Sequence, residues 1–271
     1  MTFPKSQVMQ RIHGNVDRLL EGGMTIAQNI ITSEFSSPFR STSQSGLASP
    51  FVKSLFPEIK LAATLERSLN TALGWGWDKI VTDIARATHG NGQVGYYVNG
   101  TIPATTAGMI NDIVHGYTSG TGHSVPDTKA ELAALLPTVS VAGARENVRE
   151  KDDSYYVDSS GIENHIEIKT PKPNYDQLRA SKRRILRIHV VRNPNTVKAI
   201  VGMPYNPNGR YGTYGWPTTP IFLDPKQDLL IGADFWNYIG NDNETYDQLL
   251  KCFNEVYMAR RSDLLDLLEQ A

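Results

Sequence analysis

The chain has 271 residues, of which 40% are hydrophobic, and its formal net charge is −1. This length allows one sizeable hydrophobic core, and the single cysteine, Cys252, excludes an intrachain disulfide framework and a cysteine-rich zinc site. The chain has no run of about 18 apolar residues, and Met1–Gln10 lacks a basic segment followed by an apolar one. We therefore expect a cytoplasmic protein without a membrane span or a signal peptide.

The first third of the chain is predicted to be mostly helical. Lys5–Thr32 has a helical pattern with a break near Gly22-Gly23, and Ser33–Pro50 is rich in Ser, Pro, Phe and Thr and predicts a loop. Pro57 suits the first turn of a helix, because that turn has no use for the missing amide hydrogen. The helical pattern then continues to about Thr88.

Short elements are predicted before the middle of the chain. Gly90–Pro126 is full of Gly, Thr and Ser, which indicates loops with one or two short elements. Thr128 followed by Glu131 forms a capping-box pattern, and the helix that it begins ends at Pro137.

The segment from Ser154 to Lys169 predicts a β-hairpin. Ser154–Val157 is aromatic and β-branched, and Asp158–Gly161 is a turn sequence. His165–Lys169 then alternates polar and apolar residues, as does a strand with one buried face. This alternation places Glu167 and Lys169 together on one face of the strand.

The remaining elements complete a mixed fold. Tyr175 to about Ile188 predicts a basic helix, Thr196–Met203 an apolar strand, and Tyr205–Pro220 a loop. Residues from Asp234 onward predict mostly helix. This order favours an α/β or α+β core, with a central mixed β-sheet flanked by helices.

Acidic residues and a lysine converge in the predicted hairpin. If the hairpin closes on its turn, Asp153 or Asp152 lies across from Glu167, with Lys169 on the same face. Carboxylate oxygens can hold Mg²⁺, which can activate water and neutralise charge on a phosphate, while a lysine can orient or deprotonate that water. The pattern therefore predicts metal-dependent phosphodiester hydrolysis.

An acid before one strand, followed by acid-x-lysine on the next, resembles the PD-(D/E)XK nucleases. The sequence Glu-Ile-Lys-Thr-Pro-Lys-Pro-Asn, residues 167 to 174, resembles the active-site strand of the TdeIII-type type II restriction endonucleases. Residues 65–74 with Trp77-Asp78, and residues 230–237, are similar to flanking segments of that family. The resemblance spans roughly residues 49 to 258. The family often has glutamate where Asp78 stands, which weakens any role transferred to that position.

The resemblance implies a restriction-endonuclease-like fold and assigns roles to several residues. Asp153 and Glu167 would bind Mg²⁺, with Lys169 as the third catalytic residue. Asp152 is the substitute for Asp153, and Glu66 and Asp78 are possible additional acids, although a solvated helix face also explains either one. Cleavage would leave a 5′-phosphate and a 3′-hydroxyl, and a GGNCC-type target is possible.

Several basic and amide residues are candidates for DNA contact. No acidic residue occurs between Gln177 and Asn193, and four cations in that stretch fall near one helical face. A solvated face explains any one of them, and an ordinary turn-rich loop is at least as good an explanation for the three loop candidates. The DNA-binding candidates are Lys172, Asn174, Arg179, Lys182, Arg183, Arg187, Asn206, Asn208 and Arg210.

We therefore expect a type II restriction endonuclease that acts on double-stranded DNA. Residues 1–271 would form a single nuclease domain, with residues 1–56 as an N-terminal extension for dimerisation or DNA contact. Palindromic targets favour a homodimer, in which one active site faces each strand. The alternatives are a structure-specific or repair nuclease with the same core, and a non-catalytic DNA-binding protein.

Overall fold

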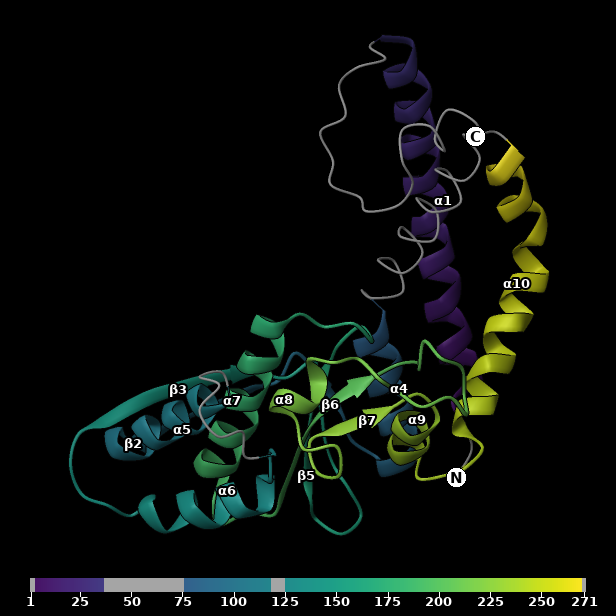
Figure 1. Cartoon of the computed structure of the whole chain (residues 1–271). Helices are drawn as coiled ribbons and strands as arrows, with labels where there is room; N and C mark the ends of the chain where they lie inside the picture. The colour runs from purple at the N-terminus through teal and green to yellow at the C-terminus, as the bar shows by residue number, and fades with distance from the viewer. Residues whose placement is uncertain (1–2, 37–75, 118–124, 270–271) are drawn as a thin grey trace. The chain divides into compact units, whose positions relative to one another are not determined.

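The computed structural model describes residues 3–36, 76–117 and 125–269 (Figure 1). The chain divides into two compact units. The first unit comprises Met1–Pro4 and Trp77–Gln248, and the second comprises Lys5–Gly76 and Leu249–Ala271.

A five-stranded mixed sheet forms the centre of the first unit. Its strands, in spatial order, are β1 (Gln93–Val94), β4 (Ser154–Val157), β5 (Glu163–Ile168), β6 (Val197–Met203) and β7 (Leu229–Ile231). Strand β4 is antiparallel to both β1 and β5, whereas β5, β6 and β7 run parallel to one another. The predicted hairpin is confirmed as β4 and β5, with Ser154 opposite Ile166. The predicted mixed sheet flanked by helices is therefore confirmed.

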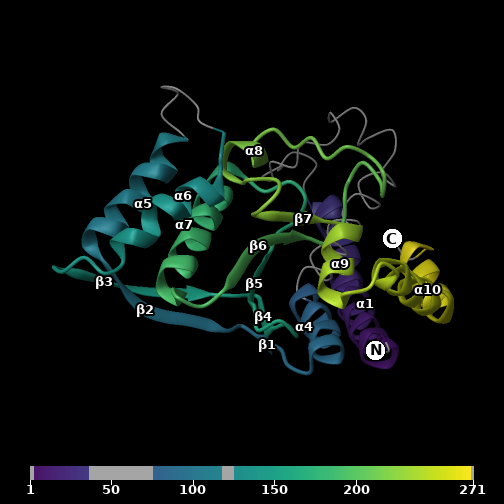
Figure 2. The ribbon, with the colours of Figure 1, turned by 90° about the horizontal axis from the view of Figure 1, so that it is seen from below.

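Helices cover both faces of this sheet (Figure 2). On one face, Ile185 and Ile188 of α7 (Tyr175–Arg192) pack against Val201 of β6. On the other face, α4 (Trp77–His89) contacts β4 and α9 (Ala233–Gly240). The other helical segments of this unit are α5 (Ala104–Gly116), α6 (Thr128–Leu135), the 3₁₀ turn η1 (Leu136–Thr138) and α8 (Thr219–Phe222).

A long antiparallel ribbon extends from the sheet. It consists of β2 (Tyr97–Pro103) and β3 (Arg145–Lys151), paired throughout from Tyr97 opposite Lys151 to Pro103 opposite Arg145. The ladder continues without a change of register into β1 and β4, through backbone bonds from Asp152 N to Tyr96 O (2.7 Å) and from Gly95 N to Asp153 O (3.2 Å). Gly95 has a φ of 67°, a left-handed value that glycine adopts without steric cost. The ribbon and the first two strands of the central sheet, β1 and β4, are thus formed by the same two chain segments.

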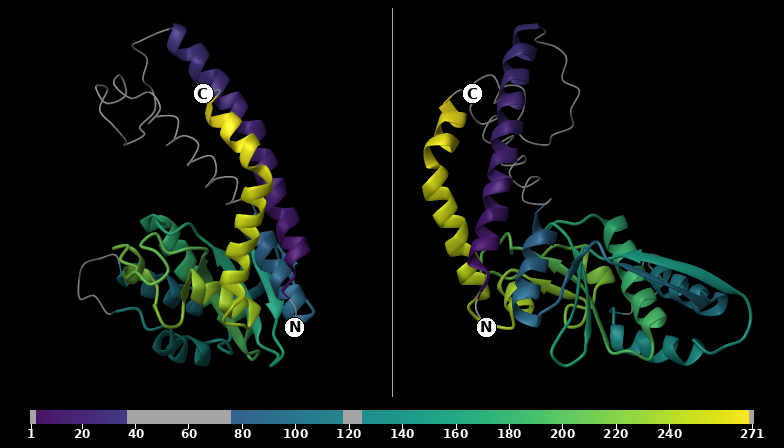
Figure 3. Two further views of the ribbon diagram at one scale, coloured as in Figure 1. Left: turned by 90° about the vertical axis from the view of Figure 1, so that its right-hand side faces the viewer. Right: turned by 180° about the vertical axis from the view of Figure 1, so that it is seen from behind.

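The second unit contains α1 (Lys5–Ser36) and the greater part of α10 (Thr245–Glu269) (Figure 3). Lys5 pairs with Glu255 at 2.7 Å, and Arg260 with Asp17 at 2.6 Å, so the two helices run in the same direction. Apolar residues on both helices are buried, namely Val8, Ile12, Val16, Leu249, Cys252 and Val256.

Two predictions about local structure were wrong. Helix α1 continues through Gly22 and Gly23, since a glycine costs a helix only about 1 kcal/mol and does not end it. The segment predicted to be mostly loops, Gly90–Pro126, contains a seven-residue strand and the 13-residue helix α5. The helix predicted from Pro57 is observed only in its last part, as α4, because residues 57–75 lie outside the described part of the chain.

Among the described helices, none has the length and apolar character needed to cross a membrane.

Candidate active site

The β4–β5 hairpin brings Asp153 to Glu167. The Asp153 amide donates to Ile166 O at 3.0 Å, and the Asp153 Oδ2 atom accepts from the Ile168 amide at 2.7 Å. Asp153 therefore lies across from Glu167, one residue before β4 begins. The backbone hydrogen bond holds the Asp153 carboxylate against the strand that carries Glu167.

Lys169 completes the group. Its Nζ atom lies 2.6 Å from Glu167 Oε1, and both side chains are mostly buried, with 24% of Lys169 and 12% of Glu167 exposed. The Lys169 amide donates to Gly202 O at 3.0 Å, which fixes the end of β5 to β6. Position 202 needs a glycine, because a Cβ atom there would lie 2.2 Å from the Phe235 ring of α9. Two carboxylates and one ammonium group thus meet at the end of β5.

The environment of Asp153 favours its protonated form. Burial raises the pKa of Asp153 above its ordinary value, and the neighbouring carboxylate of Glu167 adds to the rise. The hydrogen bond from Ile168 and the positive charges of Arg184 and Lys169 oppose the rise without cancelling it. A cation bound beside Asp153 would lower this pKa again, because it favours the charged form of the carboxylate.

Asp152, the predicted substitute, is committed elsewhere. It is fully buried, and its two oxygens contact His165 Nδ1 at 2.7 Å and the Nη2 atom of Arg184. Its oxygens are therefore occupied by protein groups. Of the two adjacent aspartates, Asp153 is the one that faces Glu167 and Lys169.

Arg184 is a residue that the sequence analysis did not assign to the site. Its Nη1 atom lies 3.5 Å from Glu167 Oε2, its Nη2 contacts Asp152, and its Nε donates to Lys151 O at 3.2 Å. Only 7% of its side chain is exposed. Arg184 therefore ties the α7 helix to both strands of the site and helps to hold Glu167 in place. Its place in a run of basic residues concealed this role, because its partners lie on β3, on β5 and at Asp152 just before β4.

The donor set fits a hard divalent cation. Glu167 Oε2 is buried and accepts no hydrogen bond from any described residue, so it retains lone pairs for a ligand. Mg²⁺ prefers oxygen ligands and commonly takes one or two carboxylates, with waters and substrate phosphates completing its coordination. Within the described residues, no group of three or more His, Cys, Asp or Glu side chains is arranged to hold a metal. The site therefore fits a divalent cation that is bound by two protein carboxylates, those of Asp153 and Glu167.

The two additional acids receive no such support. Glu66 lies outside the described residues. Asp78 is in the first turn of α4, and its Oδ1 atom accepts from the Lys79 amide at 2.8 Å. That hydrogen bond caps the start of its own helix.

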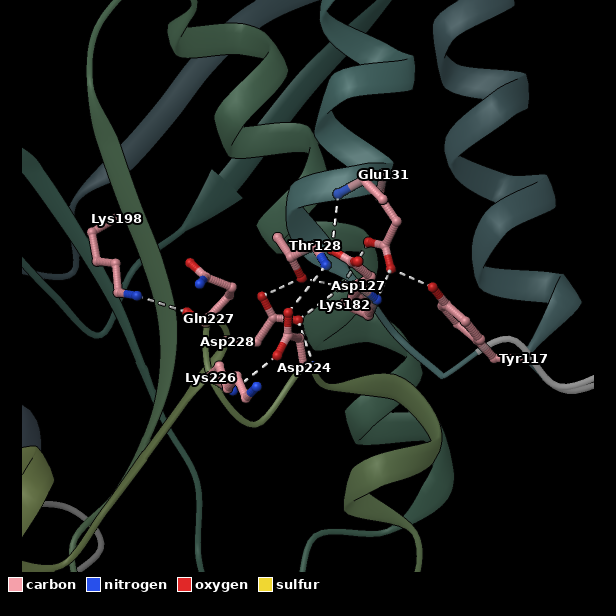
Figure 4. A network of polar contacts seen from close by, with 11 residues as sticks. Tyr117, Asp127, Thr128, Glu131, Lys182, Lys198, Asp224, Lys226, Gln227 and Asp228 are labelled. Atoms are coloured by element: carbon pink, nitrogen blue, oxygen red, sulfur yellow. Dashed lines mark hydrogen bonds and ion pairs between the residues drawn. The ribbon is translucent and has the colours of Figure 1, made fainter.

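The structure places Lys182 in the interior of the protein, away from any DNA-binding surface. It is fully buried, and its Nζ atom contacts Glu131 Oε2 at 2.7 Å, Asp228 Oδ2 at 2.8 Å and Thr128 Oγ1 at 2.6 Å (Figure 4). Asp228 also accepts from Thr128 Oγ1 at 2.6 Å. These contacts tie α6, α7 and the β7 end of the sheet together, so the ammonium group has no access to DNA.

The other basic residues of α7 have partners of their own. Arg187 contacts Glu150 at 3.2 Å, Arg183 donates to Asn111 at 3.1 Å, and the more exposed Arg179 contacts Asp176 at 3.0 Å. Helix α7 packs against β6, β2, α5 and α6, so it is a central helix and presents no continuous basic face. The helical spacing of these residues was correct, but Arg183 and Arg187 have their partners on α5 and β3, and Arg179 has its partner in the first turn of α7.

The remaining candidates lie in exposed segments. Lys172 is exposed over the Trp216 ring, 5.9 Å from its centre, whereas Asn174 caps α7 by accepting from Gln177 at 2.9 Å. In the 205–213 loop, the side chain of Asn206 donates to Gly212 O at 2.6 Å and that of Asn208 to Thr213 O at 2.8 Å. These two asparagines therefore shape their own loop.

Arg210 is also held within the protein. It forms a two-pronged ion pair with Asp247, in which Nη2 lies 3.0 Å from Oδ2, and it lies over the rings of Tyr211 and Tyr246. Its contact with DNA stays a prediction.

Comparisons with known proteins identify the family. Residues 23–257 match the model of the family described as type II restriction endonuclease, HinfI. The type II restriction enzymes HgiEI and HgiBI of Herpetosiphon aurantiacus are each 29% identical over 234 residues, which cover 85% of this chain and 85% of each relative. The type II restriction enzyme HgiCII of the same organism is 28% identical over 226 residues, covering 82% of both chains. The chain therefore belongs to the HinfI family of type II restriction endonucleases and is a site-specific deoxyribonuclease.

Proposed function

We propose that this restriction endonuclease cleaves double-stranded DNA in a Mg²⁺-dependent reaction at the Asp153–Glu167–Lys169 site, in the manner of the PD-(D/E)XK superfamily. The observation that carries the proposal is the meeting of these three side chains at the end of β5, with the 2.6 Å contact between Lys169 and Glu167. Type II restriction enzymes generally use divalent metal ions, and an oxygen-only donor set favours Mg²⁺.

Each residue has a distinct task in this reaction. Asp153 and Glu167 would hold the metal, which supplies an activated water and neutralises charge on the phosphate. Lys169 Nζ orients the attacking water, accepts or releases its proton, and stabilises the negative charge that develops on the phosphate oxygens. Arg184 keeps Glu167 directed toward the site. In-line attack then leaves a 5′-phosphate and a 3′-hydroxyl.

The similarity of residues 167–174 to the TdeIII-type enzymes supports a GGNCC-type target. A palindromic target of this kind favours a two-fold symmetric homodimer, in which each copy cuts one strand. We further propose that residues 1–271 act as one nuclease, with residues 1–56 serving dimerisation or DNA contact. Lys172 and Arg179, both exposed, remain candidates for phosphate contact.

The test is digestion of a large sequenced phage DNA by the purified protein, with Mg²⁺ and with a chelator. We expect discrete fragments only with Mg²⁺, and sequencing of their ends gives the target and the cut position. A smear would contradict sequence-specific cleavage and favour a structure-directed nuclease. Intact DNA across a range of salt and divalent metals would favour a protein that only binds DNA.

Variants test the assignment of the site. Lys169→Ala is expected to lower the cleavage rate by about 10²- to 10⁴-fold, the usual contribution of a general acid or base, and to leave DNA affinity largely unchanged. Lys226→Ala removes an exposed lysine in the loop before β7 and is the matched control. Near-normal cleavage by Lys169→Ala would show that the active site has been assigned wrongly.

A further inference from the structure

One face of the β2–β3 ribbon is uncovered and cationic. Alternation along the strands buries Val98, Ile102 and Val148 on one side, against α5 and α7. In Figure 2, these helices lie on that side of the ribbon, and no described element covers the other side. We call the exposed residues of this opposite side the outer face. They are Tyr97, Asn99, Thr101, Arg145, Asn147, Arg149 and Lys151.

The charges of the outer face are unusual for this protein. It carries three cations and no carboxylate, although the whole chain has a net charge of −1. Arg149 lies 4.5 Å from the centre of the Tyr97 ring, and Arg145 Nε donates to Thr101 Oγ1 at 2.9 Å. Among the described residues, no carboxylate pairs with either arginine or with Lys151. The arginines and lysines of α7 differ, because nearly all have an acidic partner in the protein.

The ribbon has dimensions that suit duplex DNA. Seven residue pairs span roughly 20 Å at about 3.4 Å per residue, which equals the rise of roughly six base pairs. The major groove of B-DNA is about 12 Å wide and accepts a two-stranded β-ribbon. Asn99 and Asn147 stand among the cations of the outer face, and an amide side chain can pair with the edge of adenine.

The ribbon also leads directly to the proposed active site. Lys151, the last residue of β3, precedes Asp153 by two positions in the continuous ladder that leads into β4, which is about 7 Å along the chain. A duplex bound along the outer face would therefore pass close to the carboxylate that we assign to the metal. This placement matches what a site-specific nuclease requires, namely a reading element fixed to the cutting group.

From these observations we infer that the outer face of the β2–β3 ribbon is the element with which this endonuclease docks on its target duplex. Arg145, Arg149 and Lys151 contact the DNA backbone, and Asn99 and Asn147 reach base edges in the major groove. The inference rests on the activity of the family and does not require the metal site or its lysine to be assigned correctly.

Binding measurements without metal test the cationic part. The probe is a 40-base-pair duplex in EDTA, titrated with the full chain over a range of salt concentrations. The double variant Arg149→Gln/Lys151→Gln is expected to bind more weakly, and the slope of log affinity against log salt to fall by about one for each lost phosphate contact. Lys226→Gln is the control and should change neither quantity. An unchanged affinity and slope in the double variant would overturn the inference.

Specificity measurements test the asparagines. Wild type, Asn99→Ala and Asn147→Ala digest a duplex library that carries the target with every single-base substitution. Each variant is expected to lose discrimination at one base pair by about 5- to 150-fold, whereas cleavage at the other positions keeps its ranking. An unchanged ranking in both variants would refute base reading by the ribbon.

A cross-link supplies a readout that is independent of affinity. Cys252 is buried, so Asn99→Cys introduces a reactive thiol on the outer face, and Lys226→Cys places a matched thiol elsewhere. With a photoreactive label on the thiol, Asn99→Cys should cross-link to DNA and Lys226→Cys should not. The urea midpoint of each variant should equal that of wild type, since every altered side chain is exposed. Failure of the Asn99 cross-link would overturn the inference even if Mg²⁺-dependent cleavage is confirmed.

Discussion

Substitution of Lys182 by alanine should destabilise the protein strongly without altering its DNA surface. The variant leaves Glu131 and Asp228 buried and facing an empty site, since Lys182 contacts them at 2.7 and 2.8 Å and is itself fully buried. Removal of one partner from a buried ion pair typically costs about 3–5 kcal/mol. The free energy of unfolding should therefore fall by about that amount, a large part of a typical total of about 5–15 kcal/mol.

Urea unfolding, followed by tryptophan fluorescence, measures this change. Arg179→Ala is the matched control on the same helix, because Arg179 is exposed and forms only an ion pair with Asp176, so its effect should stay within about 0.5 kcal/mol. Combining Lys182→Met with Glu131→Gln and Asp228→Asn removes all three charges together and should recover most of the lost stability. A loss below about 1 kcal/mol in Lys182→Ala, accompanied by weaker DNA binding, would refute the buried network and support the surface role that the helical spacing first suggested.

Three other substitutions, and one control substitution, test the site and the core. Burial raises the pKa of Asp153, so the folded state resists ionisation of this carboxyl group, and the free energy of unfolding falls as pH rises through that pKa. Asp153→Asn should therefore raise the urea midpoint at about pH 8 in EDTA. The same variant should abolish cleavage. Burial lowers the pKa of His189 from 6.5 to about 4, so only the unfolded chain binds this proton in that window. The melting temperature of the wild type should therefore decrease as pH is lowered from 6.5 to 4, and that of His189→Gln should decrease less over the same range. Gly202→Ala should lower the free energy of unfolding by about 1–3 kcal/mol, because the new Cβ would overlap the buried Phe235. Its control, Gly108→Ala in α5, has open space around it and should raise that free energy by up to about 1 kcal/mol. Equal urea midpoints in the two variants would contradict the close packing at Gly202.

The sequence predicted the hairpin of the proposed active site because the pattern that specifies this hairpin is local. Within the 16 residues from Ser154 to Lys169, an aromatic strand, a turn and an alternating strand specify the pairing and the shared face of Glu167 and Lys169. The choice between Asp152 and Asp153 required the structure, because it depends on Arg184 and His165, which are distant in the chain or on the neighbouring strand.

The ribbon and the buried lysine escaped detection for a different reason. In β3 only Val148 is apolar, so a strand that is exposed on one side and charged at both ends gives almost no periodic signal. Its partner β2 is more than 40 residues earlier in the chain. Lys182 likewise meets carboxylates that are about 50 residues away in either direction. Spacing along one helix indicates which residues share a face, but it cannot show what that face contacts.

The unbroken register from β2–β3 into β1–β4 limits how this enzyme can acquire new targets. A one-residue insertion or deletion within β3 would turn every following side chain to the opposite side, and Asp153 would turn with them. Grafting a foreign ribbon would carry the same risk at both of its ends. Single exchanges on the outer face leave the strand length untouched. Enzymes of this architecture that cut different sequences should therefore differ by point substitutions on the outer face. The length of β3 should be the same in all of them.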